Sequence, residues 1–469
     1  MNLFFLVFFL MASFLEASSP NQTNTTTPVK FSDSLSFEIS VELANFSLPN
    51  GLQSFVAGSH GDKWLFLAGR TNGLHDFSNT THNFPPRKQN TTVYVVDFNN
   101  HTVHSKSLRS DSSGLTGQQI DTLSVTAAQF KQVQGTLYVV GGYGVDSATG
   151  GFSTKPTLTA IDVPGLMHWV EDADKGETAA QYIRQISHPL LQVTGGYLDQ
   201  ANPHTPFLLI FGQNFPTFYL DSSNGFYTQQ VRSFNLVDEG DHLAIIPNPS
   251  EEPLPAYRRR DLNVVPIIQK KENSYESSFV ALSGVFTQKI GVWTVPVLID
   301  AWGNSSMADP SKPSTFKQGM NNYSSATLQL FSKKANQMHM LILGGISFIT
   351  YKDGVFTKDT EFPFTNNITD VCIDSQGQFA QYLMDAEYPV IPSTFANLGN
   401  PLLFGSTAQF IPLSRLLKFP NGVISLDDLE DNAVLGYVVG GIASTVPNTE
   451  GPSDSIASSY IFQVKLNKR

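Results

Sequence analysis

The sequence predicts an all-β protein built from about six similar units of four strands each. Three observations carry this prediction: a hydrophobic strand motif ending in glycine occurs six times, a second strand motif ending in aspartate occurs five times, and charged residues are few. Of the 469 residues, 15% are charged and 41% are hydrophobic, which is typical of exported β-rich proteins rather than of cytosolic helical enzymes. The length allows one large domain or two smaller ones.

The first motif is an apolar run that ends in a pair of small residues. Apolar runs of this length, closed by glycine, are typical of strands buried between packed sheets. The final glycines allow a sharp turn and a close approach of neighbouring backbone. The six copies are residues 64–69, 137–142, 208–212, 279–284, 340–345 and 436–441.

The second motif follows the first five copies and consists of an apolar strand that ends in aspartate before a turn. An aspartate suits a turn because its carboxylate accepts hydrogen bonds from nearby backbone N–H groups. A scaffold needs such a residue in every unit, whereas a catalytic pair does not need five copies. We therefore interpret all five as structural: Asp97, Asp162, Asp221, Asp300 and Asp374.

Candidate innermost strands precede the glycine motifs, for instance at residues 124–133, 325–331 and 406–413. Each unit then has four strands, which is the composition of one blade of a β-propeller. The last unit lacks an outer strand, and the alternating segment 35–43 can supply it. We predict that this N-terminal strand pairs in the last blade and closes the ring, which removes an exposed sheet edge.

The insertions at residues 348–364 and 411–434 are long enough to hide further strands, so six and seven blades both remain open.

The glycine pair after a hydrophobic strand, followed by an aromatic-containing strand and a further strand, resembles the kelch repeat over residues 34–464. Only three of the six pairs are Gly-Gly, and the tryptophan of the kelch outer strand is matched by Trp169 and loosely by Trp302. The resemblance implies a propeller and no particular ligand. Kelch-like propellers include protein-binding scaffolds, sugar-acid mutarotases and copper oxidases of the galactose oxidase type.

The first fifteen residues form an apolar run that is too short to span a bilayer and lies where a secretory signal belongs. We expect a signal peptide over residues 1–19, a disordered Asn/Thr-rich leader over 20–33 and the propeller over 34–469. The protein is then secreted, or periplasmic in a bacterium, without a stable membrane anchor. Nine Asn-X-Ser/Thr sequons would carry glycans if the source is eukaryotic.

Several classes of function are disfavoured. The net charge of −11 and the lack of a basic stripe argue against nucleic acid. The ten histidines are scattered, so we expect no metal, and no glycine-rich phosphate loop opens a helix, so we expect no nucleotide cofactor. The single cysteine, Cys372, lies in an apolar run and is expected to be a buried, inert thiol.

The loops after the glycine motifs and those that lead into each blade open on one face, which we expect to be the binding face. Three adjacent arginines there could hold a carboxylate, sulfate or phosphate, or could alternate in direction and pair with acids such as Asp261. His75 and Asp76 are a weaker candidate base and orienting group. The candidate ligand-binding residues are Arg70, Tyr143, Gln213, Asn214, Arg258, Arg259, Arg260 and Asp261.

Three functional hypotheses follow. The first is a non-catalytic propeller that binds a glycan or a protein through the loop-rich face. The second is a carbohydrate-active enzyme, mutarotase-like or lyase-like, that acts on an acidic sugar held by the arginines. The third is a structural or envelope protein, which predicts an exposed apolar patch and no polar funnel.

Overall fold

The computed structural model describes residues 29–469 except for 77–82, 173–175, 220–224 and 273. The chain is 46% strand and 9% helix, and it forms a β-propeller, so the all-β prediction is confirmed. No helix in the described part is long and apolar enough to cross a membrane. The expected signal peptide and residues 20–28 of the expected leader lie outside the described residues.

Residues 29–33, which the sequence placed in a disordered leader, are ordered. Strand β1 (Val29–Phe31) pairs in parallel with β28 (Phe379–Glu387). The side chain of Val29 is buried in a small cluster with Met320 and Leu383, which explains why this segment is held against the sheet.

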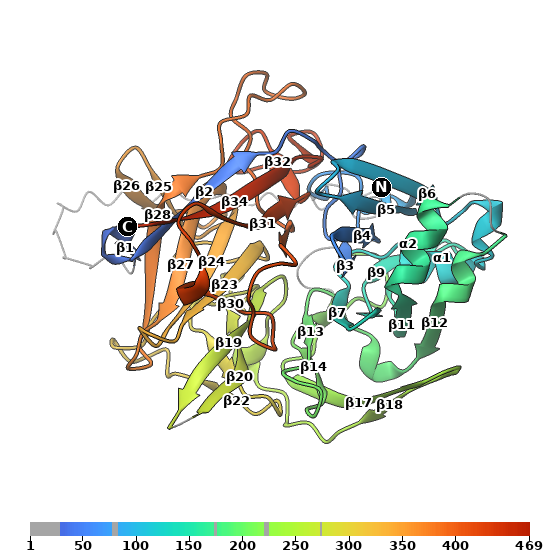
Figure 1. Ribbon diagram of the computed structural model, residues 1–469, viewed down its shortest axis with the longest axis horizontal. Coiled ribbons are helices and arrows are strands. Elements are labelled where there is room, and N and C mark those ends of the chain that lie inside the picture. The colour runs from blue at the N-terminus through green and yellow to red at the C-terminus, as the bar shows by residue number, and fades with distance from the viewer. Residues whose placement is uncertain (1–28, 77–82, 173–175, 220–224, 273) are drawn as a thin grey trace, which may run out of the picture.

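Five sheets of four antiparallel strands are found among the described residues, arranged around the molecule in chain order, with a larger sheet between the fourth and the fifth (Figure 1). In each of the first four of these sheets, the strands lie side by side in the order in which they occur along the chain. The strands of the five sheets are β3 (Val56–His60), β4 (Lys63–Leu67), β5 (Thr92–Asp97) and β6 (Thr102–Ser107); β7 (Gln129–Val133), β8 (Thr136–Val140), β11 (Thr157–Asp162) and β12 (Ile183–Ser187); β13 (Tyr197–Asp199), β14 (Phe207–Ile210), β17 (Val231–Glu239) and β18 (His242–Pro247); β19 (Asn263–Lys271), β20 (Ser274–Leu282), β21 (Val297–Ile299) and β22 (Ser305–Met307); and β29 (Gln409–Pro412), β31 (Ala433–Val439), β34 (Ile461–Lys468) and β2 (Phe37–Leu43).

The remaining large sheet has six strands in the order β1-β28-β27-β24-β23-β30. Its other members are β23 (Ala326–Ser332), β24 (Gln337–Ile346), β27 (Phe364–Ile373) and β30 (Ile424–Ser425). The prediction of six equal four-stranded blades is therefore corrected: five sheets have that form, and β1 and β30 each extend the sixth sheet by one parallel strand. Strand β30 lies in the insertion 411–434, which the sequence indicated was long enough to hide a further strand, whereas the apolar pattern did not reveal β1.

The glycine motifs lie where the repeat predicts. All six occupy the second strand of a sheet or the turn that follows it, and four of these turns carry a small extra hairpin. The hairpins are β9 (Tyr143–Asp146) with β10 (Gly151–Thr154), β15 (Gln213–Asn214) with β16 (Phe226–Tyr227), β25 (Ile349–Lys352) with β26 (Val355–Lys358), and β32 (Ile442–Ser444) with β33 (Ser455–Ala457).

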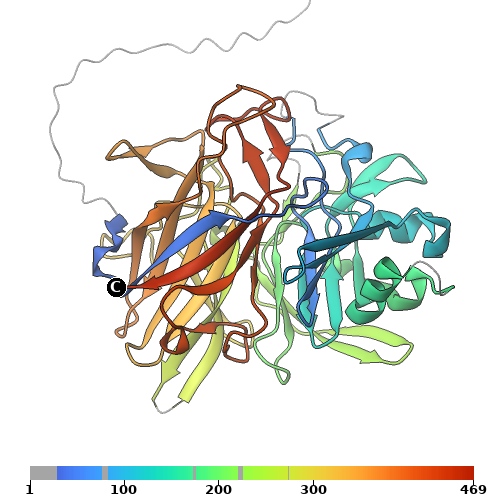
Figure 2. The ribbon, with the colours of Figure 1, turned by 45° about the horizontal axis from the view of Figure 1, so that its top comes forward.

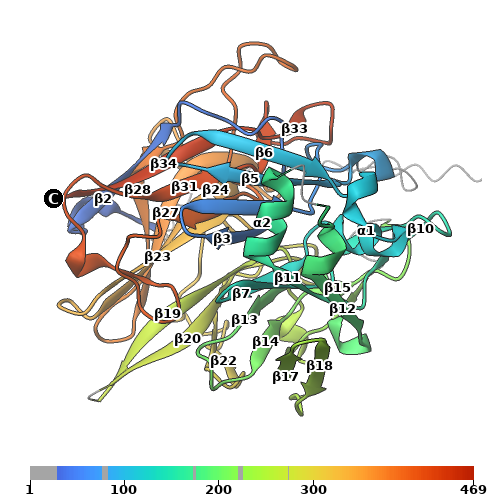
Figure 3. The ribbon, with the colours of Figure 1, turned by 45° about the vertical axis from the view of Figure 1, so that its right-hand side comes forward.

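The two α-helices lie on the outside of the ring near β5, β6 and β12 (Figure 3). They are α1 (Gly117–Leu123) and α2 (Val163–Glu171). Trp169, which was matched to an outer kelch strand, lies instead in α2, and Trp302 lies exposed in the turn between β21 and β22. Short 3-10 helices occupy Ser32–Ser34, Pro86–Lys88, Asp111–Ser113, Ala179–Tyr182, Pro189–Leu191, Pro255–Tyr257 and Leu426–Asp428.

The described aspartates of the second motif are structural, as interpreted. Asp97, Asp300 and Asp374 each accept two backbone N–H hydrogen bonds in the turn that follows the third strand. Asp162 instead caps the N-terminus of α2 by accepting from the Gly165 N–H. Asp221 lies outside the described residues.

A cycle of six backbone hydrogen bonds lies at the start of the sheets. In each large sheet, the residue two positions before the first strand donates its N–H to the carbonyl of the equivalent residue in the preceding sheet, over 2.8–3.3 Å. Five of the six have a left-handed backbone, with φ between 45° and 63°. The donors and acceptors, in order, are Ala127 to Ser54, Gly195 to Ala127, Asp261 to Gly195, Ser324 to Asp261, Thr407 to Ser324 and Ser54 to Thr407.

The N-terminal strand β2 pairs antiparallel with the C-terminal strand β34, with Ile39 opposite Leu466 and Val41 opposite Val464. Figures 1 and 2 show the two strands side by side, one blue and one red. The inward residues of β2 are buried in the largest apolar cluster of the protein. The predicted pairing of segment 35–43 with the last strand is thus observed.

Gly441 offers a test of why the repeat ends in glycine. A Cβ at Gly441 would lie 2.7 Å from the Ser406 carbonyl oxygen, whereas a Cβ at Gly354, which has a similar φ, meets nothing within 4 Å. We expect Gly354→Ala to lower the free energy of unfolding by about 1 kcal/mol, from the left-handed φ alone. Gly441→Ala should lower it by about 2 kcal/mol more because rigid backbone must move. Urea denaturation of both variants measures the difference, and equal losses would contradict the steric role.

Candidate functional site

A cavity of about 1180 Å³ opens where the cycle of backbone hydrogen bonds meets the axis, and all six residues of the cycle line it. The residues after the glycine motifs reach the same space because isolated bridges pair them with the residues that precede the cycle, for example Gln53 with Arg70 and Thr126 with Tyr143. The repeat therefore places a ring of side chains from successive sheets around one cavity. The predicted binding face holds this cavity.

Arg70 is the most distinctive group in the cavity wall. Only 2% of the residue is exposed, its Nε donates to Asn72 Oδ1 at 3.0 Å, and its guanidinium carbon lies 4.8 Å from the centre of the Phe84 ring. Its Nη2 has no hydrogen-bond partner, and no carboxylate of the described residues lies within ion-pair distance. Burial lowers the pKa of Arg70 to about 10, so the side chain remains cationic at neutral pH.

Arg260 contributes a second guanidinium to the cavity. Its Nη1 donates to Gln213 Oε1 at 2.7 Å, and its Nε lies 3.2 Å from Asp261 Oδ2. The guanidinium carbon also lies 5.3 Å from the Phe215 ring and 5.5 Å from the Phe286 ring. Burial raises the pKa of the Asp261 carboxyl, while the charge of Arg260 opposes that rise.

The three arginines do not converge on the cavity, so the hypothesis of a triple clamp is corrected. Arg259 is fully buried on the opposite side, where it donates to the carbonyls of Ser283 at 3.0 Å and Val295 at 2.8 Å. Arg258 packs on the Tyr227 ring and donates to the Phe286 carbonyl. Successive residues of an extended segment point to opposite sides, which explains why Arg259 points away from Arg260. Arg258 lies on the same side as Arg260, since both guanidinium groups lie over the Tyr227 ring, but Arg258 does not reach the cavity lining.

The other predicted site residues are also divided between the cavity lining and positions outside it. Tyr143 lines the cavity, and its hydroxyl donates to the Thr217 carbonyl at 3.1 Å. Gln213 is fully buried behind the wall and holds Arg260, as described above. Asn214 is half-buried in the β15–β16 hairpin and does not line the cavity.

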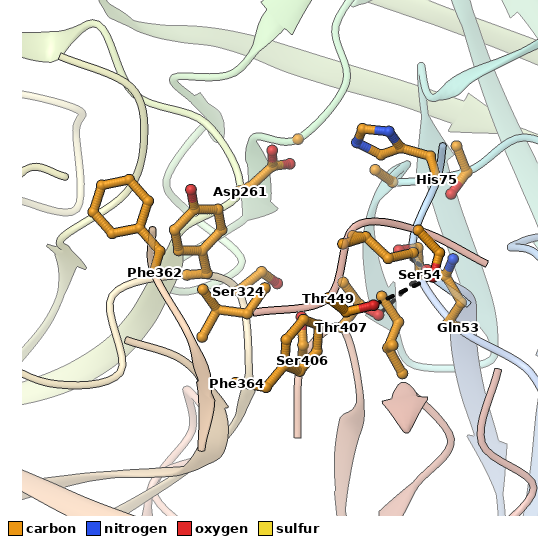
Figure 4. Close-up of a pocket in the computed structure, with 18 of the residues that line it drawn as sticks. Gln53, Ser54, His75, Asp261, Ser324, Phe362, Phe364, Ser406, Thr407 and Thr449 are labelled. Carbon is orange, nitrogen blue, oxygen red and sulfur yellow. Dashed lines mark hydrogen bonds between the residues drawn. The ribbon is translucent and has the colours of Figure 1, made fainter. Parts of the chain in front are cut away.

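His75 also lines the cavity, although a single His-Asp dipeptide was only a weak signal in the sequence. Its ring lies 5.0 Å from the Phe84 ring and 4.9 Å from the Tyr219 ring. Burial and the charges of Arg260 and Arg70 lower the pKa of His75 to about 4, so the imidazole is neutral at pH 7. In Figure 4, His75 and Asp261 reach the cavity from different sheets.

Sequence reasoning missed the apolar part of the lining. Some of its residues come from two loops, 286–290 and 360–364, and from the ends of strands at two glycine motifs, and others come from the loop after β4, the β15–β16 connection and the segment before β23. Segment 348–364 was recognised as an insertion, but nothing in its sequence indicated that it turns inward. The missed lining residues include Phe84, Tyr219, Phe286, Ile290, Tyr323, Ile346, Phe362, Phe364 and Ile442.

One buried cluster in the described part has the residue types of a metal site, and it lies in the β24–β27 pair rather than in the cavity lining. His339 Nδ1 and Asp370 Oδ2 are 2.7 Å apart, and the His339 ring packs edge-on against Phe37. Burial raises the pKa of Cys372, as expected for an inert thiol.

Comparisons with known proteins identify no family. No family model and no curated protein matches the chain. Among solved structures, 166 chains are similar to it, and one of them is described as the structure of YjhT. That chain is 11% identical, has a TM-score of 0.46, and the match covers 88% of this protein and 95% of the other.

Proposed function

We propose that the propeller has six blade positions, one of which is the six-stranded sheet between the fourth and the last four-stranded sheets. We propose too that its repeats are kelch-like. The cycle of six backbone hydrogen bonds supports the six blade positions, because each large sheet contributes one residue to it and the last residue bonds back to the first. We also propose that the ring is closed by β2, which sits on the outer side of β34 and leaves that strand no free edge.

Hydrogen exchange tests the closure. If β2 closes the ring, the amides of β34 lie between two strands and should exchange far more slowly than those of β6, which is the outer strand of its sheet. Mass spectrometry of peptides covering residues 461–468 and 102–107 measures both rates in one sample. Equal exchange of the two strands would contradict closure by β2.

We propose that the protein is exported and acts by binding an anionic ligand, such as an acidic glycan, in the axial cavity. The observation that supports this proposal is the environment of Arg70. A buried guanidinium with an unpaired Nη2 and no carboxylate partner among the described residues is costly unless a ligand supplies the partner. Arg260 adds a second guanidinium group to the same cavity, where it is paired with Asp261. The apolar start of the chain supports export, and the N-terminus of the protein isolated from its source, expected near residue 20, tests it.

The binding proposal predicts the effect of removing one guanidinium. Arg70→Met should weaken binding of D-glucuronate, or of a uronate-bearing or sulfated glycan, by about 30-fold or more because a buried charged contact is lost. Glucose, the matched neutral sugar, should bind weakly to both proteins. Isothermal titration measures the affinities, after a glycan array has selected the acidic probe.

Arg415→Met is the control for the loss of a positive charge, because Arg415 is exposed and lies outside the cavity lining. It should leave the affinity unchanged. Arg258 is unsuitable because it donates to the carbonyl of Phe286, which lines the cavity. Arg259 is unsuitable as a control, since its loss would leave the Ser283 and Val295 carbonyls without a donor and destabilise the fold. Equal binding by wild type and Arg70→Met, or no binding of any acidic probe, would overturn the proposal and favour a protein partner or a structural role.

A second candidate is an enzyme that acts on an acidic sugar. It is favoured by His75 and Asp261, two cavity residues whose pKa values are shifted in opposite directions, because such pairs supply acid and base groups. Proton NMR of the bound probe during the same titrations distinguishes the two candidates. Conversion of the probe that is lost in Asp261→Asn would replace the binding role with catalysis, and an unchanged probe would exclude turnover of that sugar.

A further inference from the structure

We infer that the ligand of this cavity is amphipathic: besides its anionic group it carries an aryl or alkyl group that packs against the apolar side of the cavity. This inference rests on the proposed function. It comes from the separation of the cavity lining into two different walls, which a uniformly polar sugar acid would not match.

The first wall, here called the arginine wall, consists of Arg70, His75, Phe84, Tyr143, Tyr219 and Arg260. Its aromatic residues pack together in one cluster, and both guanidinium groups lie over rings of that cluster. This packing holds the two guanidinium groups in place. The arginine wall is therefore the side where an anionic group finds charge and hydrogen-bond donors.

The second wall, here called the apolar wall, consists of Ile290, Tyr323, Ile346, Phe362, Phe364 and Ile442. Ile346, Phe364 and Ile442 form the buried centre of a separate cluster, against which Tyr323 and Phe362 pack. Figure 4 shows Phe362 and Phe364 on the side of the cavity away from His75. Apart from the Tyr323 hydroxyl, these side chains offer no hydrogen bonds to sugar hydroxyls.

Within the apolar wall, Ile290 provides the strongest evidence for an apolar group on the ligand. It is 64% exposed and lies in the turn that begins at Thr287. Its φ is 56°, a left-handed conformation that a β-branched residue rarely adopts. A large apolar side chain that lines a cavity but remains open to water gains from burial by an apolar group of a ligand.

The charged residues that line the cavity indicate how a bound amphipathic ligand would be oriented. Glu361 adjoins Phe362 in the apolar wall, and Glu450 lies in the loop of the β32–β33 hairpin; both are exposed and line the cavity. These carboxylates repel an anionic group on their side of the cavity. On the other side, Asp76 also lines the cavity and Asp261 pairs with Arg260, so Arg70 is the guanidinium group that attracts the anionic group there. A cavity of about 1180 Å³ also has room for more than a single sugar ring.

A matched pair of probes tests the inference by isothermal titration. Methyl β-D-glucuronide and 4-nitrophenyl β-D-glucuronide carry the same anionic sugar and differ in the group attached to it. We expect the nitrophenyl compound to bind about tenfold more tightly or better, because the ring buries apolar surface against Ile290 and Phe362. 4-Nitrophenyl β-D-glucoside, which lacks the carboxylate, should bind much more weakly than the nitrophenyl glucuronide.

The variant Ile290→Asn tests whether the tighter binding of the nitrophenyl glucuronide depends on Ile290. Asparagine tolerates a left-handed φ, so this variant keeps the turn while it removes the apolar side chain. It should reduce the ratio of the affinities for the nitrophenyl and the methyl glucuronide several-fold. Val390→Asn is the matched control, since Val390 is also β-branched, is 76% exposed and lies outside the cavity lining.

The outcomes separate this inference from the proposed function. Equal affinities for the two glucuronides, or an advantage that Ile290→Asn leaves intact, would overturn the amphipathic ligand while anion binding stands. Equal affinities for the nitrophenyl glucuronide and the nitrophenyl glucoside would overturn the anion site itself. Failure of all three probes to bind would contradict both proposals.

Discussion

The architecture depends on the cycle of backbone hydrogen bonds that joins one residue from each large sheet. Each N–H in the cycle is satisfied by a carbonyl of the preceding sheet, so the sheets are fixed to one another at their inner ends. The left-handed backbone at Ser54, Ala127, Gly195, Asp261 and Thr407 turns the chain just before the first strand of each of these sheets. Because the cycle also surrounds the cavity, the same interaction that holds the sheets together determines which side chains face a ligand.

Two side chains of the cavity lining have environments that seldom occur in a purely structural core. Arg70 is buried without a carboxylate partner among the described residues, and Ile290 is exposed although it is apolar. Each arrangement is unfavourable for the protein alone, and both lie in the lining of one cavity. A ligand with an acidic end and an apolar end would satisfy both at once. This complementarity is the basis of the proposed binding role.

Adjacent residues of segment 258–261 illustrate how one stretch serves both structure and site. Arg259 supports the fold by binding carbonyls on the far side, whereas Arg260 and Asp261 form a close ion pair at the cavity. Gln213, which immediately follows a glycine motif, positions Arg260 through its side-chain oxygen. The site therefore depends on contacts between successive sheets, and a change in one sheet is expected to alter the side chains presented by the next.

The sequence by itself determined the all-β class, the positions of the second strands, the structural role of the turn aspartates and the pairing of the two chain ends, because these follow from local periodicity, glycine and turn chemistry. It also indicated Arg70, Tyr143, Arg260 and Asp261 as residues of one face. Only the tertiary structure decided that Arg259 and Arg258 turn away, that β1 and β30 extend one sheet, and that Phe362 and Ile290 line the cavity. Those features depend on side-chain direction and on the path of inserted loops, which are set by packing between sheets rather than by local sequence.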